Sequence, residues 1–116
     1  ITINNASQRE ENLIRAVAKH TLKGLGLTRK RKLTIHFRLL DKEDCHGEIE
    51  QDDKWTYSID LASNYKTIKD FVGTIAHELT HIAQWLDEDS YEGDGEDEAD
   101  DFAEWVVNSM WEENLI

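Results

Sequence analysis

The sequence predicts an α+β fold in which an N-terminal helix and a small, mostly antiparallel sheet of two to four strands precede two further helices. Three observations support this prediction: a helical apolar pattern near the N-terminus, two stretches with the period-2 alternation of strands, and a long helical pattern in the second half of the chain. The length of 116 residues predicts a single domain over residues 1–116.

The first helix is predicted over residues 7–23. Ser7 precedes Glu10 by three residues, which is the capping-box pattern of a helix start. Gly24 and Gly26 follow and end the helix. Its apolar residues recur every three or four positions and therefore share one face: Leu13, Ile14, Val17, Ala18 and Leu22.

Two strands are predicted over residues 33–40 and 55–61. Apolar side chains alternate with mostly polar ones in both stretches, as in strands buried on one face. The polar segment between them contains Gly47 and a turn at Asp52-Asp53, and Glu48 to Glu50 form a short middle strand. An antiparallel meander of two or three strands is the most economical connection of these segments.

Two helices are predicted in the second half of the chain. The first begins at Thr67, with Asp70 three residues on as a capping partner, and its apolar stripe runs to Leu86. The second covers residues 96–112, after a loop that contains Gly93 and Gly95. Trp85, Trp105 and Trp111 lie at helical positions, and we expect them in the core.

The composition excludes several classes of protein. The chain carries 25 Asp and Glu against 13 Lys and Arg, a formal net charge of −12. No apolar run reaches the length of a bilayer span or of a signal-peptide core, so we expect no membrane partner and favour a cytoplasmic location. The single Cys45 allows no internal disulfide framework, which agrees with a reducing compartment. We expect a monomer or a weak dimer.

The charges are distributed unevenly along the chain. Residues 1–42 hold ten Lys and Arg and three Asp and Glu. Residues 43–116 hold three Lys and Arg and 22 Asp and Glu. The basic residues have no interleaved aromatics, and the net field repels phosphates, so we expect no nucleic-acid partner. The acids are densest in residues 87–104, where they form either a solvated surface or metal ligands. A third hypothesis, an acidic mimic of nucleic acid, needs these acids on one exposed stripe.

The helix that begins at Thr67 contains His77-Glu78-Leu79-Thr80-His81, the HExxH pattern. Residues four apart on a helix point the same way about one turn apart, so both imidazoles can bind one zinc ion. Glu78 lies on the flank of this pair, where it can take a proton from a water that zinc has acidified. Two surface histidines with a solvated Glu are the alternative, but His77, His81 and Trp85 share one side of the helix, opposite its apolar stripe.

A catalytic zinc site needs a third protein ligand and leaves the fourth position to water. No His or Cys follows His81, so the third ligand is expected to be a downstream carboxylate. Glu96 is the best placed, because it opens the final helix after a loop that can turn the chain back over the zinc, and Glu98 is the next candidate. Asp100, one turn after Glu96, can accept a hydrogen bond from the second nitrogen of a ligand imidazole.

These two motifs, HELTH followed by GEDEADDFAEW, resemble the gluzincin zinc metallopeptidases, and the chain most resembles the minigluzincins, which are small single-domain members. The resemblance implies a zinc cofactor with His77, His81 and Glu96 as ligands, Glu78 as general base and acid, and a peptide or protein substrate. It favours Glu96 over Glu98. The residue that stabilises the oxyanion is unassigned, and its candidates are Tyr57, Tyr65, Tyr91 and His46.

The resemblance also gives two other segments a role. It implies that residues 55–61 form an edge strand that pairs with an extended substrate, although an ordinary edge strand fits the pattern equally well. Minigluzincins are latent, with a terminal segment in the cleft, and residues 111–116 can supply such a plug or simply cap the core. From a different class, the alternative function is a non-catalytic interaction protein whose structural zinc has four protein ligands, with a carboxylate or His46 in place of water.

Overall fold

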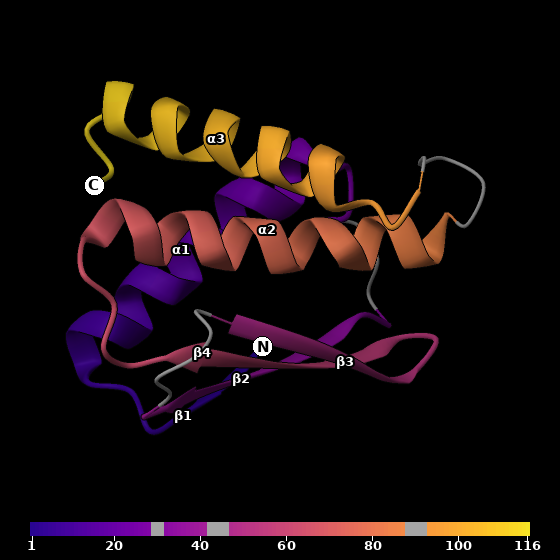
Figure 1. Cartoon of the computed structure of the whole chain (residues 1–116). Helices are drawn as coiled ribbons and strands as arrows, with labels where there is room; N and C mark the ends of the chain where they lie inside the picture. The colour runs from indigo at the N-terminus through magenta and orange to yellow at the C-terminus, as the bar shows by residue number, and fades with distance from the viewer. Residues whose placement is uncertain (29–31, 42–46, 88–92) are drawn as a thin grey trace.

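A computed structural model describes residues 1–28, 32–41, 47–87 and 93–116. Within these residues the chain forms three α-helices and one four-stranded sheet, which confirms the α+β class (Figure 1). The elements, in chain order, are β1 (Thr2–Asn4), α1 (Gln8–Gly24), β2 (Thr34–Leu40), β3 (Gly47–Asp53), β4 (Thr56–Ala62), α2 (Ile68–Leu86) and α3 (Glu96–Glu112).

The helices begin where their capping residues predict. Ser7 Oγ accepts a hydrogen bond from the backbone N–H of Glu10, and the Glu10 carboxylate accepts one from the N–H of Ser7. Thr67 Oγ1 likewise accepts from the N–H of Asp70 at the start of α2. These local contacts satisfy backbone donors at the starts of α1 and α2 that have no partner within the helix. α3 follows Gly95 without a side-chain cap. The bounds of all three helices agree with the predictions to within about two residues.

The sheet has the order β1-β2-β4-β3, and its topology corrects the predicted antiparallel meander. β1 pairs with β2 in parallel, β2 pairs with β4 in parallel, and only β3 pairs with β4 in antiparallel fashion. The alternation of apolar residues sets which face of a strand is buried, but it carries no information about the direction of the neighbouring strand. β1 was not predicted, because three residues are too few to show an alternation.

The strand order also corrects the prediction for residues 55–61. These residues form β4, which lies between β2 and β3 and is not an edge strand. The edge strands of the described sheet are β1 and β3, and β3 is a charged strand in which Glu48, Glu50, Asp52 and Asp53 are exposed.

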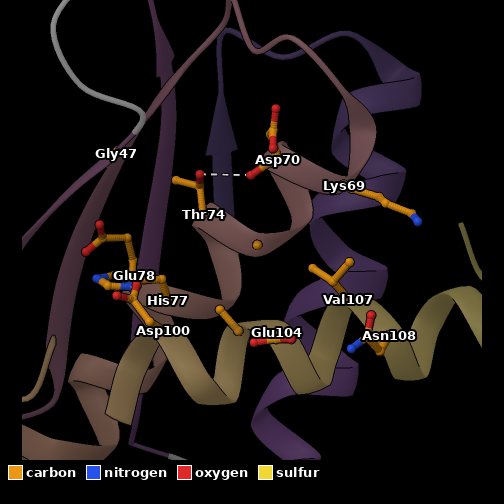
Figure 2. Close-up of a pocket in the computed structure, with 12 residues that line it drawn as sticks. Gly47, Lys69, Asp70, Thr74, His77, Glu78, Asp100, Glu104, Val107 and Asn108 are labelled. Carbon is orange, nitrogen blue, oxygen red and sulfur yellow. Dashed lines mark hydrogen bonds and ion pairs between the residues drawn. The ribbon is translucent and has the colours of Figure 1, made fainter. Parts of the chain in front are cut away.

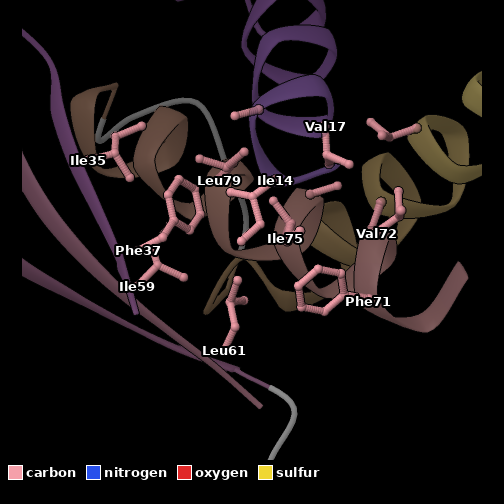
Figure 3. Packing of buried hydrophobic residues seen from close by; sticks show 14 of the residues in the cluster. Ile14, Val17, Ile35, Phe37, Ile59, Leu61, Phe71, Val72, Ile75 and Leu79 are labelled. Carbon is pink, nitrogen blue, oxygen red and sulfur yellow. The ribbon is translucent and has the colours of Figure 1, made fainter. Parts of the chain in front are cut away.

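The helices cover one side of the sheet, and α3 lies on the far side of α2 from the strands (Figure 1). The core fills the space between α1, α2 and the inner face of β2 and β4, where Phe37, Ile59 and Leu79 are fully buried (Figure 3). Because α2 is covered by the sheet and by α3, several of its polar side chains are buried as well: Glu78, Thr80, His81 and Gln84. Buried polar groups of this kind need partners.

The tryptophans only partly meet the prediction that they belong to the core. Trp85 is half-buried and packs against the core cluster. The side chains of Trp105 and Trp111 are exposed, and both lie on the outer helix α3. In the described parts of the chain, none of the helices is both long enough and apolar enough to cross a membrane.

Candidate metal centre

The two histidines of the HExxH pattern face each other on α2. His77 and His81 are one turn apart, their ring centroids are 4.8 Å apart, and the two Nε2 atoms are separated by 3.2 Å. His81 is buried, and His77 is partly exposed toward the surface between α2 and α3. The helical spacing of the sequence therefore brings two imidazole nitrogens to one point, as expected.

Glu96 completes a cluster with these two nitrogens. Its Oε2 lies 2.9 Å from His77 Nε2, and its Oε1 lies 3.1 Å from His81 Nε2. The other candidate, Glu98, is exposed and its carboxylate is 3.5 Å from the amide nitrogen of Gln84. Among the described residues, His77, His81 and Glu96 are the group of side chains with the spacing to hold a metal ion.

The start of α3 places Glu96 at this point. Gly95 has a left-handed φ of 78°, and a Cβ on it would lie 2.2 Å from Gln84 Oε1, so backbone conformation and space both require glycine. Asp94 Oδ1 accepts a hydrogen bond from the N–H of Glu96 at 3.0 Å. The carboxylates of the first turn also face the positive end of the helix dipole, which favours their charge.

A second partner orients each imidazole. Asp100 Oδ1 lies 2.9 Å from His77 Nδ1, the contact expected from the spacing of Glu96 and Asp100. Gln84 Oε1 lies 2.8 Å from His81 Nδ1. Both partners are acceptors at these distances, so Nδ1 of each ring is a donor, and the neutral ring with its proton there presents the lone pair of Nε2. Sequence reasoning missed Gln84, although its position three residues after His81 places it within reach of that ring.

The cluster thus combines three groups that can each donate an electron pair to a metal ion. His77 Nε2, His81 Nε2 and the carboxylate of Glu96 lie within 3.2 Å of one another. A cation between the groups, either a metal ion or a proton carried by an imidazole, stabilises such an arrangement. Tetrahedral zinc with bonds of 2.0–2.1 Å separates its ligand atoms by about 3.4 Å, so the three groups fit the ion with a small relaxation.

Glu78 lies beside this cluster and is buried, with 8 % of its surface exposed. The pKa of its carboxyl group is raised, and burial is the largest cause. His77 and His81 lower this pKa, whereas the charges of Glu96 and Glu48 raise it further. Gly47 at the start of β3 packs close to this region, because a Cβ there would lie 2.8 Å from Thr74 Cγ2 and 3.6 Å from Glu78 Cγ. Glycine therefore lets the edge strand approach the helix next to Glu78.

Two hollows meet at these residues. A groove of about 530 Å³ runs between α2 and α3 toward Val107 and Asn108, and a hollow of about 480 Å³ lies on the side of His81 and Glu96. Both are lined by Gly47, His77 and Glu78. Figure 2 shows His77, Glu78 and Asp100 together at one end of the groove and Val107 and Asn108 at the other. The candidate metal site therefore opens to both hollows.

Two tyrosines proposed to stabilise an oxyanion lie elsewhere. The hydroxyl of the buried Tyr57 donates to the backbone carbonyl of Lys54, and that of Tyr65 lies 3.4 Å from Glu10 Oε2. Neither residue lines the two hollows. Burial raises the pKa of both hydroxyls. The other two candidates, Tyr91 and His46, lie outside the described residues, as does Cys45.

The C-terminal segment 111–116 caps the core at the end of α3 opposite Glu96 (Figure 1). Ile116 packs against the hydrophobic core, and the N–H of Leu115 donates to the carbonyl of Met110. The Lys69 ammonium lies 4.0 Å from the ring centre of Trp111, near the start of α2. No residue of 111–116 lines the two hollows, so in this structure the segment has the position of a cap rather than of a plug.

No protein-family model, curated protein or solved structure matches this chain. The likeness to the gluzincins therefore depends on two short motifs, residues 77–81 on α2 and residues 96–103 on α3.

Proposed function

We propose that this protein is a zinc-dependent peptidase, with His77, His81 and Glu96 as zinc ligands and Glu78 as general base and acid. The observation that carries the proposal is the convergence of two imidazole Nε2 atoms and a carboxylate within 3.2 Å, with an acceptor at Nδ1 of each imidazole. Two His and one Glu are a ligand set of catalytic zinc sites in hydrolases. Zinc bound there lowers the pKa of water and polarises a carbonyl group.

Glu78 is suited to the proton transfers of peptide hydrolysis. It lies next to His77 in sequence, lines both hollows, and does not belong to the group that can hold the metal. Its carboxylate accepts the proton of the attacking water and later delivers a proton to the amine that leaves. Burial raises its pKa, which makes it a stronger base than an exposed glutamate.

The edge strand β3 offers a place for the substrate. It lies at the end of the sheet next to the hollows, and Gly47, Glu48 and Ile49 line the one on the side of His81. An extended peptide can add to such an edge through main-chain hydrogen bonds. The role first assigned to residues 55–61 thus passes to β3, and the substrate class remains a peptide or an unfolded protein segment.

The rival function is a non-catalytic protein with a structural zinc. Such a site is closed by four protein ligands, whereas the metal-binding group found in the described residues has three members. The exposed side of Glu96 and the two hollows also leave room for a water molecule and a substrate. These features favour the catalytic proposal.

The test is peptide cleavage by the zinc-loaded protein and by two variants. Incubation with a diverse peptide mixture, read by mass spectrometry, should reveal new termini for the wild type and none for Glu78→Gln, which should retain one equivalent of zinc. Glu112→Gln, a matched change at the distant end of α3, should cleave like the wild type. Cleavage by Glu78→Gln at the wild-type rate, or none by the zinc-loaded wild type, would refute the proposal.

A further inference from the structure

Gln84 is a buried polar residue whose contacts bridge two helices. It lies on α2 and is only 1 % exposed. Its Oε1 lies 2.8 Å from His81 Nδ1, and its Nε2 donates to the backbone carbonyl of Gly95 at 2.8 Å. Gly95 immediately precedes Glu96. The Gln84 side chain therefore contacts the candidate ligand His81 and also the residue just before the candidate ligand Glu96.

The contact with Gly95 fixes the orientation of the amide. A backbone carbonyl can only accept a hydrogen bond, so the group that faces it must be the NH₂ of Gln84. The amide oxygen then faces His81, and the ring must donate from Nδ1. The neutral His81 ring therefore presents the lone pair of Nε2 toward His77 and Glu96, which is the form that binds a metal.

The same side chain contacts the backbone at the start of α3. The carbonyl of Gly95 accepts from Gln84 and also from the N–H of Ala99 in the first turn of α3. A Cβ at position 95 would come within 2.2 Å of Gln84 Oε1, so the loop passes as close to the amide as glycine permits. This contact holds the first turn of α3 against α2, next to Glu96.

From these contacts we infer that Gln84 is a positioning residue of the metal centre: its oxygen selects the tautomer of His81, and its NH₂ holds the start of α3 so that Glu96 meets the two imidazoles. This inference rests on the proposed function for the role of the metal. The hydrogen bonds themselves are a property of the metal-free protein, which allows the two ideas to be tested separately.

Two substitutions of Gln84 separate its two contacts. Gln84→Met has a similar length and removes both hydrogen bonds. Gln84→Glu keeps an acceptor for His81 Nδ1 but loses the donor to the Gly95 carbonyl. Thr80→Val is the matched control, because Thr80 is equally buried on α2 and its hydroxyl donates only to the carbonyl of Ala76 within the helix.

The first measurement uses the full chain without metal, at about pH 8 where neutral imidazole predominates. Nitrogen-15 NMR of labelled histidines reports which nitrogen of His81 carries the proton, and hydrogen exchange reports the protection of the Ala99 amide. We expect Nδ1–H in the wild type, Thr80→Val and Gln84→Glu, and a mixture of tautomers in Gln84→Met. Exchange at Ala99 should be faster in both Gln84 variants than in the control.

The second measurement is zinc affinity by competition with a chelator. Loss of an outer hydrogen-bond partner of a ligand typically weakens metal binding by about 10–100-fold, and we expect this for Gln84→Met. Gln84→Glu should bind zinc more tightly than Gln84→Met, because its carboxylate still orients His81.

The inference is overturned if Gln84→Met keeps both the wild-type tautomer of His81 and the wild-type zinc affinity. It is also overturned if Gln84→Glu loses as much zinc affinity as Gln84→Met. If the wild type binds no zinc, the proposed function fails, and the tautomer and exchange measurements still decide whether Gln84 positions His81 and the start of α3.

Discussion

Asp100 Oδ1 on α3 lies 2.9 Å from His77 Nδ1 on α2. Asp100 lies one turn after Glu96 on α3, and Glu96 contacts the other nitrogen of the same ring, Nε2. Both nitrogens of one ring therefore face carboxylates of α3. A carboxylate at Nδ1 fixes the tautomer of the ring and makes Nε2 a better electron-pair donor.

Replacing Asp100 should weaken zinc binding without unfolding the protein. We expect Asp100→Ala to lower the zinc affinity by about tenfold, the lower end of the range for such partners, because the Asp100 side chain is 71 % exposed. Asp101→Ala removes the same formal charge from the neighbouring residue and should bind zinc like the wild type. Competition with a chelator measures both, and equal affinities of the two variants would show that Asp100 does not act through His77.

The two glutamates at the start of α3 should differ sharply in their effect on zinc. Glu96→Ala removes a ligand and should lower the affinity by more than the roughly 100-fold that loss of an outer partner can cost. Glu98→Ala should have a small effect, because Glu98 contacts the cluster only through a 3.5 Å approach to Gln84. Calorimetric titration with zinc distinguishes them, and the reverse order would make Glu98 the third ligand.

Glu78 should make the stability of the metal-free protein depend on pH. Its folded-state pKa is raised by burial, so the unfolded carboxyl ionises first as the pH rises. The native state therefore loses stability between the ordinary pKa of Glu, about 4.3, and the raised folded value. Glu78→Gln should remove this loss. With chelator present, the Tm of Glu78→Gln minus the Tm of the wild type should be larger at pH 7 than at pH 4. A difference that is independent of pH would contradict the burial argument.

The close approach of β3 to α2 should make Gly47 sensitive to substitution. Gly47→Ala places a Cβ 2.8 Å from Thr74 Cγ2, and such overpacking typically costs about 1–3 kcal/mol of unfolding free energy. Thr74→Ser removes that methyl group and should restore most of the loss in the double variant. Urea unfolding measures the three variants. Additive effects of the two substitutions would mean that the contact is not the cause.

The C-terminal segment should contribute to stability and not to inhibition. Trp111→Ala removes the contact with the Lys69 ammonium, which is worth about 0.5–1 kcal/mol at an exposed site. Because Trp111 does not line the hollows at the metal site, its removal should leave the rate of peptide cleavage unchanged. A rate increase in Trp111→Ala, measured at a temperature where both proteins are folded, would restore the hypothesis of a C-terminal plug.

Features encoded by neighbouring residues could be predicted from the sequence. The capping contacts of Ser7 and Thr67 fix the starts of α1 and α2 locally. The apolar stripe of residues 96–112 is likewise a local pattern, and the predicted bounds match α3. The pairing of His77 with His81 followed from the helical period. Glu96 was the best placed carboxylate after the loop, and the resemblance favoured it over Glu98. These contacts need little information about the rest of the fold.

The remainder depended on contacts between distant segments. The parallel pairing of β2 and β4 and the edge position of β3 are set by how the strands assemble, which alternation alone does not specify. Gln84 acquires its role only when the loop at Gly95 approaches α2, and a polar residue on a core helix carries no local sign of such a partner. The packing of Trp85 between the rings of His81 and Tyr57 is of the same kind.

The proposed zinc site has two imidazoles and one carboxylate as ligands and an open position. A zinc X-ray absorption spectrum of the loaded protein, together with metal analysis, counts these ligands. We expect one zinc per chain with two nitrogen ligands at about 2.0–2.1 Å and oxygen ligands at about 2.0–2.2 Å from Glu96 and water, the latter displaced by a hydroxamate inhibitor. Less than a tenth of an equivalent of zinc, or four protein ligands and no exchangeable water, would contradict the account.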